Sequence, residues 1–141
     1  MGQEWSRRFS LNHPVLDEQH KELFRLANCV EAMDARSVNK ESLSLVIKKM
    51  FHYMREHFKE EEEYMHNIDY PLIQKHKKLH QDIIEAMTRI LQETKGVEEL
   101  QAKIKMLSHK WLVEHILESD LQIERWRLSN TVIANEEYLR L

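Results

Sequence analysis

The stretch HFKEEEEYMHNIDYPLIQKHKKLH, residues 57–80, decides how this chain folds. It holds four histidines, four consecutive glutamates and the turn signal Asp-Tyr-Pro. Residues four apart share a helix face, so His57 pairs with Glu61 and His76 with His80. Counted from the aspartate of the turn, Glu61 lies 8 residues back and His76 7 forward, while His57 lies 12 back and His80 11 forward. The stretch therefore predicts a helical hairpin whose polar pairs face each other at two matching levels.

Helix-favouring residues dominate the rest of the chain, which contains only two glycines and two prolines. Apolar residues at spacings of three and four predict four long helices joined by short links. Their expected bounds are residues 16–33, 40–67, 71–94 and 97–120. Asn39 is expected to cap the second helix. We therefore predict an all-α fold, an antiparallel up-down-up-down four-helix bundle over residues 1–120.

The chain continues beyond this bundle. Residues 121–141, LQIERWRLSNTVIANEEYLRL, contain no glycine or proline and place apolar residues at irregular helical spacing. They predict a C-terminal helical extension. This extension is either a continuation of the fourth helix or a separate helix that binds a partner.

Composition excludes several classes of function. The 21 Lys and Arg and 24 Asp and Glu residues leave a net charge of −3 with both signs interspersed, so nucleic acid is not an expected partner. No apolar run approaches the ~20 residues that cross a bilayer, so no membrane is expected either. The single cysteine, Cys29, excludes an internal disulfide and fits a reducing compartment. We expect a cytoplasmic protein.

Each predicted helix brings one histidine to nearly the same height of the bundle. Counting from the other two links adds His20 and His115 to the level of the hairpin histidines, within three residues in each case. Four other histidines do not share this pattern and are expected to be ordinary surface or half-buried residues: His13, His52, His66 and His109. Of the four glutamates only Glu61 has the four-residue spacing from His57, and the others are expected to include a solvated face.

Five imidazoles and a carboxylate without partners would be costly in a bundle core. A bound metal removes this cost, and bundle cores are where such centres are built from facing helices. Imidazole and carboxylate ligands suit iron, but also zinc and manganese. The spacing therefore predicts a metal centre without naming the metal.

Five elements, in order along residues 5–120, resemble the bacterial single-domain members of the hemerythrin family. They are DEQH at 17–20, HFKEE at 57–61 with Met65, YP at 70–71, HKKLH at 76–80 and WLVEHILESD at 111–120. The resemblance implies two non-haem iron ions joined by an oxo or hydroxo bridge, with dioxygen as the ligand.

The resemblance also implies a role for each candidate ligand. One iron would be held by His76, His80 and His115 and the other by His20 and His57, with Glu61 and Asp120 bridging the two. The second iron would keep one open position, where dioxygen would bind. The apolar side chains expected to wall that position are Phe58, Trp111, Leu112 and Ile116.

Helix geometry and the family pattern disagree about the last ligand. On a straight α-helix Asp120 lies ~140° from His115, whereas Glu118 lies only ~60° away. The family pattern selects Asp120, and a π-type turn would bring it round. We therefore expect a local distortion between His115 and Asp120.

The donor set and the C-terminal extension bear on function. Di-iron oxygenases and ferroxidases use more carboxylates, so five histidines and two carboxylates favour reversible binding, and this domain itself is not expected to be an enzyme. The segment ANEEYLRL at 134–141 resembles the helical stem that precedes diguanylate cyclase domains. It favours an oxygen or redox sensor that regulates a covalently attached output domain in cyclic di-GMP signalling, with dimerisation through the C-terminal helix. The alternative is a free-standing oxygen carrier or storage protein.

Overall fold

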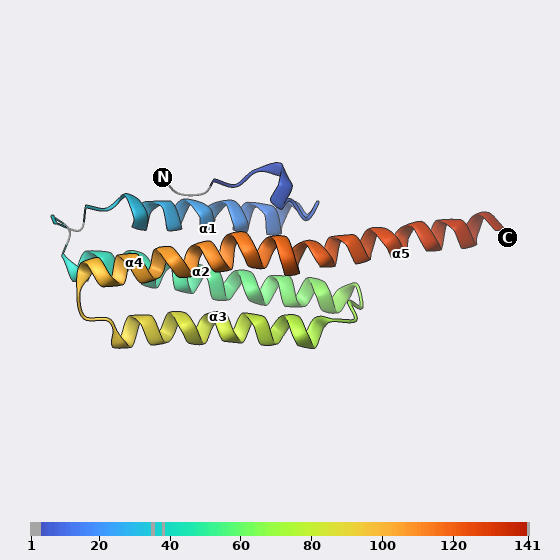
Figure 1. The fold of residues 1–141 in the computed structure, drawn as a ribbon. Coiled ribbons are helices and arrows are strands. Elements are labelled where there is room, and N and C mark those ends of the chain that lie inside the picture. The colour runs from blue at the N-terminus through green and yellow to red at the C-terminus, as the bar shows by residue number, and fades with distance from the viewer. Residues whose placement is uncertain (1–3, 35, 38, 141) are drawn as a thin grey trace.

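Four antiparallel helices form the body of the molecule (Figure 1). The computed structural model describes residues 4–34, 36–37 and 39–140, with side chains to residue 130. The helices are α1 (Pro14–Ala32), α2 (Lys40–Asn67), α3 (Ile73–Glu93) and α4 (Val97–Ser108), and each packs on the next while α4 closes the ring on α1. The all-α four-helix bundle is confirmed.

The fourth helix does not end at the bundle. From α4 the backbone runs directly into a π-helical segment, η2 (His109–Asp120), and then into α5 (Leu121–Arg140), which projects past the other helices in Figure 1. The C-terminal extension is thus a continuation of the fourth helix. Within the described residues, no helix is both long and apolar enough to cross a membrane.

Capping interactions explain where the first two helices begin. The Asn39 side chain accepts a hydrogen bond from the backbone N–H of Ser42 at 2.8 Å, as the sequence predicts. At the start of α1, Nδ1 of His13 accepts from the backbone N–H of Leu16 at 3.2 Å, and Pro14 fits the first helical position. His13 is therefore an N-cap.

The α2–α3 turn differs slightly from expectation. α2 ends at Asn67, and Asp69 takes a left-handed conformation with φ of 57°, which aspartate tolerates better than most residues. α3 begins at Ile73, so the expectation that Pro71 opens this helix is wrong by two residues. The reason is that residues 71–72 still belong to the turn.

Two apolar clusters divide the interior. The larger occupies most of the bundle and contains Phe58 and Ile116, while the smaller lies at the α2–α3 turn and contains Met65 and Ile123. On α2, Glu61 lies between Phe58 of the larger cluster and Met65 of the smaller one. The Glu61 side chain is polar and fully buried. A polar layer therefore lies between the two clusters.

Candidate metal centre

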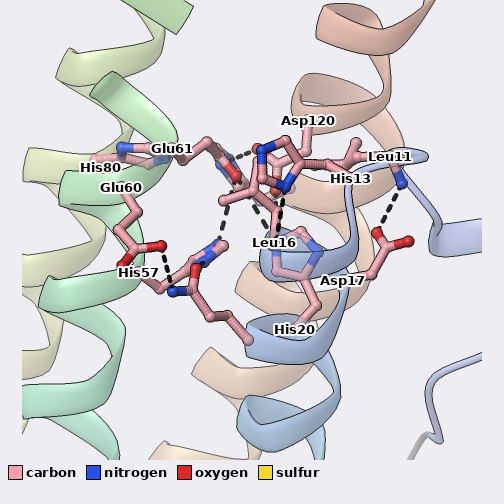
Figure 2. A network of polar contacts seen from close by, with 12 residues as sticks. Leu11, His13, Leu16, Asp17, His20, His57, Glu60, Glu61, His80 and Asp120 are labelled. Atoms are coloured by element: carbon pink, nitrogen blue, oxygen red, sulfur yellow. Dashed lines mark hydrogen bonds and ion pairs between the residues drawn. The ribbon is translucent and has the colours of Figure 1, made fainter. Parts of the chain in front are cut away.

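Seven polar side chains meet in this buried layer, several of them visible in Figure 2. All seven are 8% exposed or less. They come from all four sides of the bundle: His20 from α1, His57 and Glu61 from α2, His76 and His80 from α3, and His115 and Asp120 from η2. The structure thus brings together every residue that the sequence and the resemblance single out as a ligand.

Glu61 presents a different oxygen to each of two sets of histidines. Its Oε1 atom lies 2.7 Å from Nε2 of His76 and 3.1 Å from Nε2 of His80. Its Oε2 atom lies 3.4 Å from Nε2 of His57 and 3.8 Å from Nε2 of His20. One carboxylate therefore reaches histidines on three helices.

Asp120 does the same from η2. Its Oδ1 atom lies 2.9 Å from Nε2 of His76 and 3.0 Å from Nε2 of His115, and its Oδ2 atom lies 3.3 Å from Nε2 of His20. The candidate ligands form two groups, Glu61, His76, His80, His115 and Asp120 in one and His20, His57, Glu61 and Asp120 in the other. We call these the three-histidine side and the two-histidine side, and both carboxylates belong to both.

The π-helical backbone of η2 is what places Asp120 in this layer. A π turn closes at five residues, so it brings Asp120 onto the face of His115. Asp120 is 1% exposed, whereas Glu118 is exposed. The expected distortion is present and is longer than a single turn, because it extends over His109–Asp120.

Several atoms of the layer are buried without a hydrogen bond of good geometry. They are Nε2 of His20, His57 and His115, Oε2 of Glu61 and Oδ1 of Asp120. Unpartnered buried polar atoms destabilise a fold. A cation among them would satisfy each one, since imidazole nitrogen and carboxylate oxygen both bind first-row metals. The residues present therefore fit a metal centre.

The two carboxyl groups are held in the ionised form. Burial raises the pKa of both, and the charge of Asp120 adds to this effect on Glu61. Contacts with the surrounding histidines outweigh both effects and lower the two pKa values well below their usual range. Both groups are therefore available to bind a cation.

The histidines respond unequally to the same surroundings. Burial lowers the pKa of His76, but its contacts with Asp120 and Glu61 outweigh burial and raise the pKa to about 10. The same opposition raises the pKa of His80. Burial, helped by the charge of a neighbouring histidine, lowers the pKa of His57. In the metal-free protein His76 and His80 therefore hold a proton more strongly than His57 does.

Comparison with known proteins agrees with this geometry. Residues 12–126 match the family model of the hemerythrin HHE cation-binding domain. The chain belongs to the hemerythrin family. A bacteriohemerythrin from Campylobacter jejuni subsp. jejuni serotype O:6 is 31% identical over 118 residues, which are 83% of this chain and 89% of the relative. A myohemerythrin from Theromyzon tessulatum is 31% identical over 121 residues, which are 84% of this chain and 88% of the relative.

Two histidines of this hemerythrin domain have hydrogen-bond partners behind the centre. Nδ1 of His57 lies 2.8 Å from Oε1 of Gln19, whose Nε2 atom donates to Oε2 of Glu60 at 2.7 Å. Nδ1 of His80 lies 2.9 Å from Oε2 of Glu62. Sequence spacing identified none of these partners. Glu62, which was expected to belong with the glutamates of the solvated face, contacts a candidate ligand.

The four remaining histidines lie outside the hemerythrin centre. His52, His66 and His109 are exposed, and His13 caps α1. Among the described residues, no group of candidate metal ligands contains any of them. Their positions at the surface or half-buried are those that the sequence predicts.

The apolar residues expected to wall the open position are all buried. Phe58 stacks face to face on His80, with ring centroids 3.8 Å apart, and Trp111 meets the Phe58 ring edge-on at 5.7 Å. Leu112 and Ile116 lie in the larger apolar cluster. A surface groove of about 640 Å³ between α1 and the fourth helix has Leu112 in its lining. Their role towards a ligand stays a prediction.

Proposed function

We propose that this hemerythrin domain holds two non-haem iron ions and binds dioxygen reversibly. The observation that carries the proposal is the division of the histidines into three and two, with both carboxylates shared. In this proposal one iron is held by His76, His80 and His115, the other by His20 and His57, and Glu61 and Asp120 bridge them together with an oxo or hydroxo ligand. When bound, the iron pair supplies the electrons that dioxygen takes up.

The chain itself makes the two sides unequal. The three-histidine side offers one donor residue more than the two-histidine side. The three-histidine side would therefore surround its ion more completely, and the two-histidine side would leave room for a ligand from outside the chain. Dioxygen binds there in our proposal, beside His20 and His57, whose rings pack edge-on with centroids 4.4 Å apart.

The surrounding side chains keep the centre dry. Phe58 covers one face of His80, and Leu112 and Ile116 are 2% and 1% exposed. Apolar neighbours control solvent access to a metal site. In this domain they would slow the entrance of water and so favour release of intact dioxygen over oxidation of the centre.

The donor set argues against an oxygenase or ferroxidase. Di-iron enzymes of the ferritin-like class take a Glu from each of two helices and a Glu-x-x-His pair from the other two. This layer contains five histidines and two carboxylates. Fewer anionic donors stabilise highly oxidised iron less well, which favours binding over activation of oxygen.

Iron analysis with optical spectroscopy tests the proposal. The loaded protein should contain about two iron ions per chain, as in other di-iron bundles. Admitting air to the reduced protein should produce new near-ultraviolet and visible bands that disappear when oxygen is removed. Fewer than two irons, or an unchanged spectrum, would reject the proposal.

A second candidate function, sensing, is favoured by the position of α5. This helix begins at the residue after Asp120, which belongs to both ligand groups. Its first turns are seated on the α2–α3 turn, where Trp126 meets Tyr70 edge-on at 5.6 Å. We propose that a change at the centre alters the position of α5 and so regulates an attached output domain such as a diguanylate cyclase. A dimer contact along the C-terminal helix stays a prediction, and the side chains of residues 131–141 lie outside the described residues.

A distance measurement separates a sensor from a free-standing carrier or storage protein. Cys29 is exposed on α1 and is the single cysteine, so one fluorescent label can be placed there. A second label at Ser129→Cys reports the position of α5, and one at Arg89→Cys on α3 is the matched control. A sensor should change the first distance and not the second when oxygen binds. Two unchanged distances favour the carrier.

A further inference from the structure

We propose that Gln19 is a positioning residue for His57 and that Glu60 fixes the direction of the Gln19 amide. On the two-histidine side, the outer hydrogen-bond partner of His57 is then a neutral amide. On the three-histidine side, the outer partner of His80 is the carboxylate of Glu62. The inference deepens the proposed function and rests on it only where iron is involved, because the hydrogen bonds exist in the protein alone.

The three residues form a chain of hydrogen bonds from the surface to the centre. Glu60 is exposed, Gln19 is half-buried and His57 is 1% exposed. Oε2 of Glu60 accepts from Nε2 of Gln19 at 2.7 Å, and Oε1 of Gln19 lies 2.8 Å from Nδ1 of His57. Figure 2 shows Glu60 and His57 at the two ends of this chain. Both distances are those of well-formed hydrogen bonds.

The donor and acceptor groups allow only one direction for these hydrogen bonds. An ionised carboxylate can only accept, so the amide NH₂ of Gln19 must face Glu60. The amide oxygen then faces His57, whose Nδ1 must donate its proton. This leaves Nε2 of His57 free to offer its lone pair to the centre, where it lies 3.4 Å from Oε2 of Glu61. Glu60 therefore selects the metal-binding tautomer of His57 through two hydrogen bonds, with Gln19 between them.

The partner on the three-histidine side is different in kind. Nδ1 of His80 lies 2.9 Å from Oε2 of Glu62, with no amide between them. A hydrogen bond to an ionised acceptor is stronger than one to a neutral amide, and a carboxylate partner makes the imidazole a better donor to the metal. Gln19 thus gives His57 less donor strength, which favours the ferrous state on the side where dioxygen is proposed to bind.

The tautomer of His57 tests the positioning step without any metal. Nitrogen-15 NMR of the metal-free protein should show His57 protonated at Nδ1 when it is neutral. Gln19→Leu should shift this population towards the Nε2-protonated form, and Glu60→Gln should do so partially because the amide can then turn. The same tautomer population in wild type and Gln19→Leu would overturn the proposal.

A double variant that exchanges the amide and the carboxylate tests the effect on the metal. In the double variant Gln19→Glu with Glu60→Gln, the hydrogen bond between the two positions is retained and the net charge is unchanged, but the carboxylate now faces His57. The reduction potential of the iron-loaded double variant should fall below that of wild type. Gln19→Leu should weaken metal affinity by about 10- to 100-fold, the usual effect of losing such a partner. A double variant with the wild-type potential would overturn the proposal.

Two controls make the result specific. Glu62→Gln changes the partner of His80 to an amide and should raise the potential. Glu63→Gln removes an exposed charge from the same helix and should leave it unchanged. If wild type binds no iron while its His57 shows the expected tautomer, the proposed function fails and the positioning role of Gln19 stands.

Discussion

The three-histidine side and the two-histidine side share two carboxylates and one buried layer, yet they differ in almost every other respect. His80 has a carboxylate behind it, His57 has an amide, and Nδ1 of His20 has no hydrogen bond among the described residues. His76 holds a proton with a pKa of about 10, while the pKa of His57 is lowered. The two sides therefore differ both in the groups behind their histidines and in how strongly His76 and His57 hold a proton.

The difference bears on our proposal that two ions bind and that one of them keeps a position for dioxygen. Here the side with fewer donors has an amide behind His57 where the other has a carboxylate behind His80, while Glu61 and Asp120 belong to both sides. In our proposal the three-histidine side would contribute more to holding the ions, and the two-histidine side would take the ligand.

Removing the shared carboxylate of Glu61 should have the largest effect. Because its two oxygens face histidines from both groups, Glu61→Ala takes an anionic donor from both sides at once. Iron content should fall from about two ions per chain to well below one, measured by metal analysis after gel filtration. Glu63→Ala on the same helix is the control and should bind iron normally. Full loading of Glu61→Ala would contradict a bridging role.

Two single variants, one lacking a histidine of each side, should differ in metal binding. His80→Ala leaves the three-histidine side with four donor residues, as many as the two-histidine side has in wild type. His57→Ala leaves the other side with only three. Calorimetric titration with ferrous or zinc ions should therefore show that His57→Ala loses one binding step while His80→Ala weakens a step without abolishing it. Equal losses in both variants would mean that the sides are not distinct.

Much of this arrangement follows from sequence alone, because spacing on a helix is a strong constraint. The pairs His57 with Glu61 and His76 with His80 predict a shared face, and the Asp-Tyr-Pro turn sets the level at which the pairs meet. Glu61 does lie 2.7 Å from His76. The fold and the common height of the histidines could therefore be predicted.

Other features depend on local backbone and side-chain geometry. Regular helix geometry would select Glu118, and only the family pattern selects Asp120, because a π turn has no clear sequence signal. Sequence spacing also does not identify Gln19 and Glu62 as hydrogen-bond partners of His57 and His80. Each stands directly beside a candidate ligand, ~100° round the helix, and which of such neighbours reaches a given Nδ1 atom depends on rotamers and helix rotation.

Shortening a side chain of the apolar wall should increase the rate at which the centre is oxidised. Leu112→Ala truncates a buried side chain that lines the groove beside α1, three residues before the candidate ligand His115. It should therefore speed oxidation of the oxygenated protein by air and cost about 2–5 kcal/mol of stability. Leu43→Ala is the control, since Leu43 is equally buried but lies about 20 Å along α2 from His57. It should be destabilised to a similar degree without faster oxidation. Equal oxidation rates in the two variants would count against the pocket assignment.

Metal binding should release a proton from the three-histidine side, and this is a smaller effect than those above. A raised pKa stabilises the metal-free fold fully below the ordinary value of 6.5, and this contribution is lost as pH rises through about 10. At pH 8 His76 is therefore protonated, and a cation on the three-histidine side must displace that proton. Metal affinity should rise with pH and level off above about 10.

Calorimetry at pH 8 in buffers of different ionisation enthalpy measures this proton directly. Binding to wild type should release about one proton in the step assigned to the three-histidine side. His57→Ala should retain that release, because His76 and both carboxylates are intact, whereas His76→Ala should lose it. Release that persists in His76→Ala would place the displaced proton elsewhere in the layer and remove the electrostatic part of the distinction between the two sides.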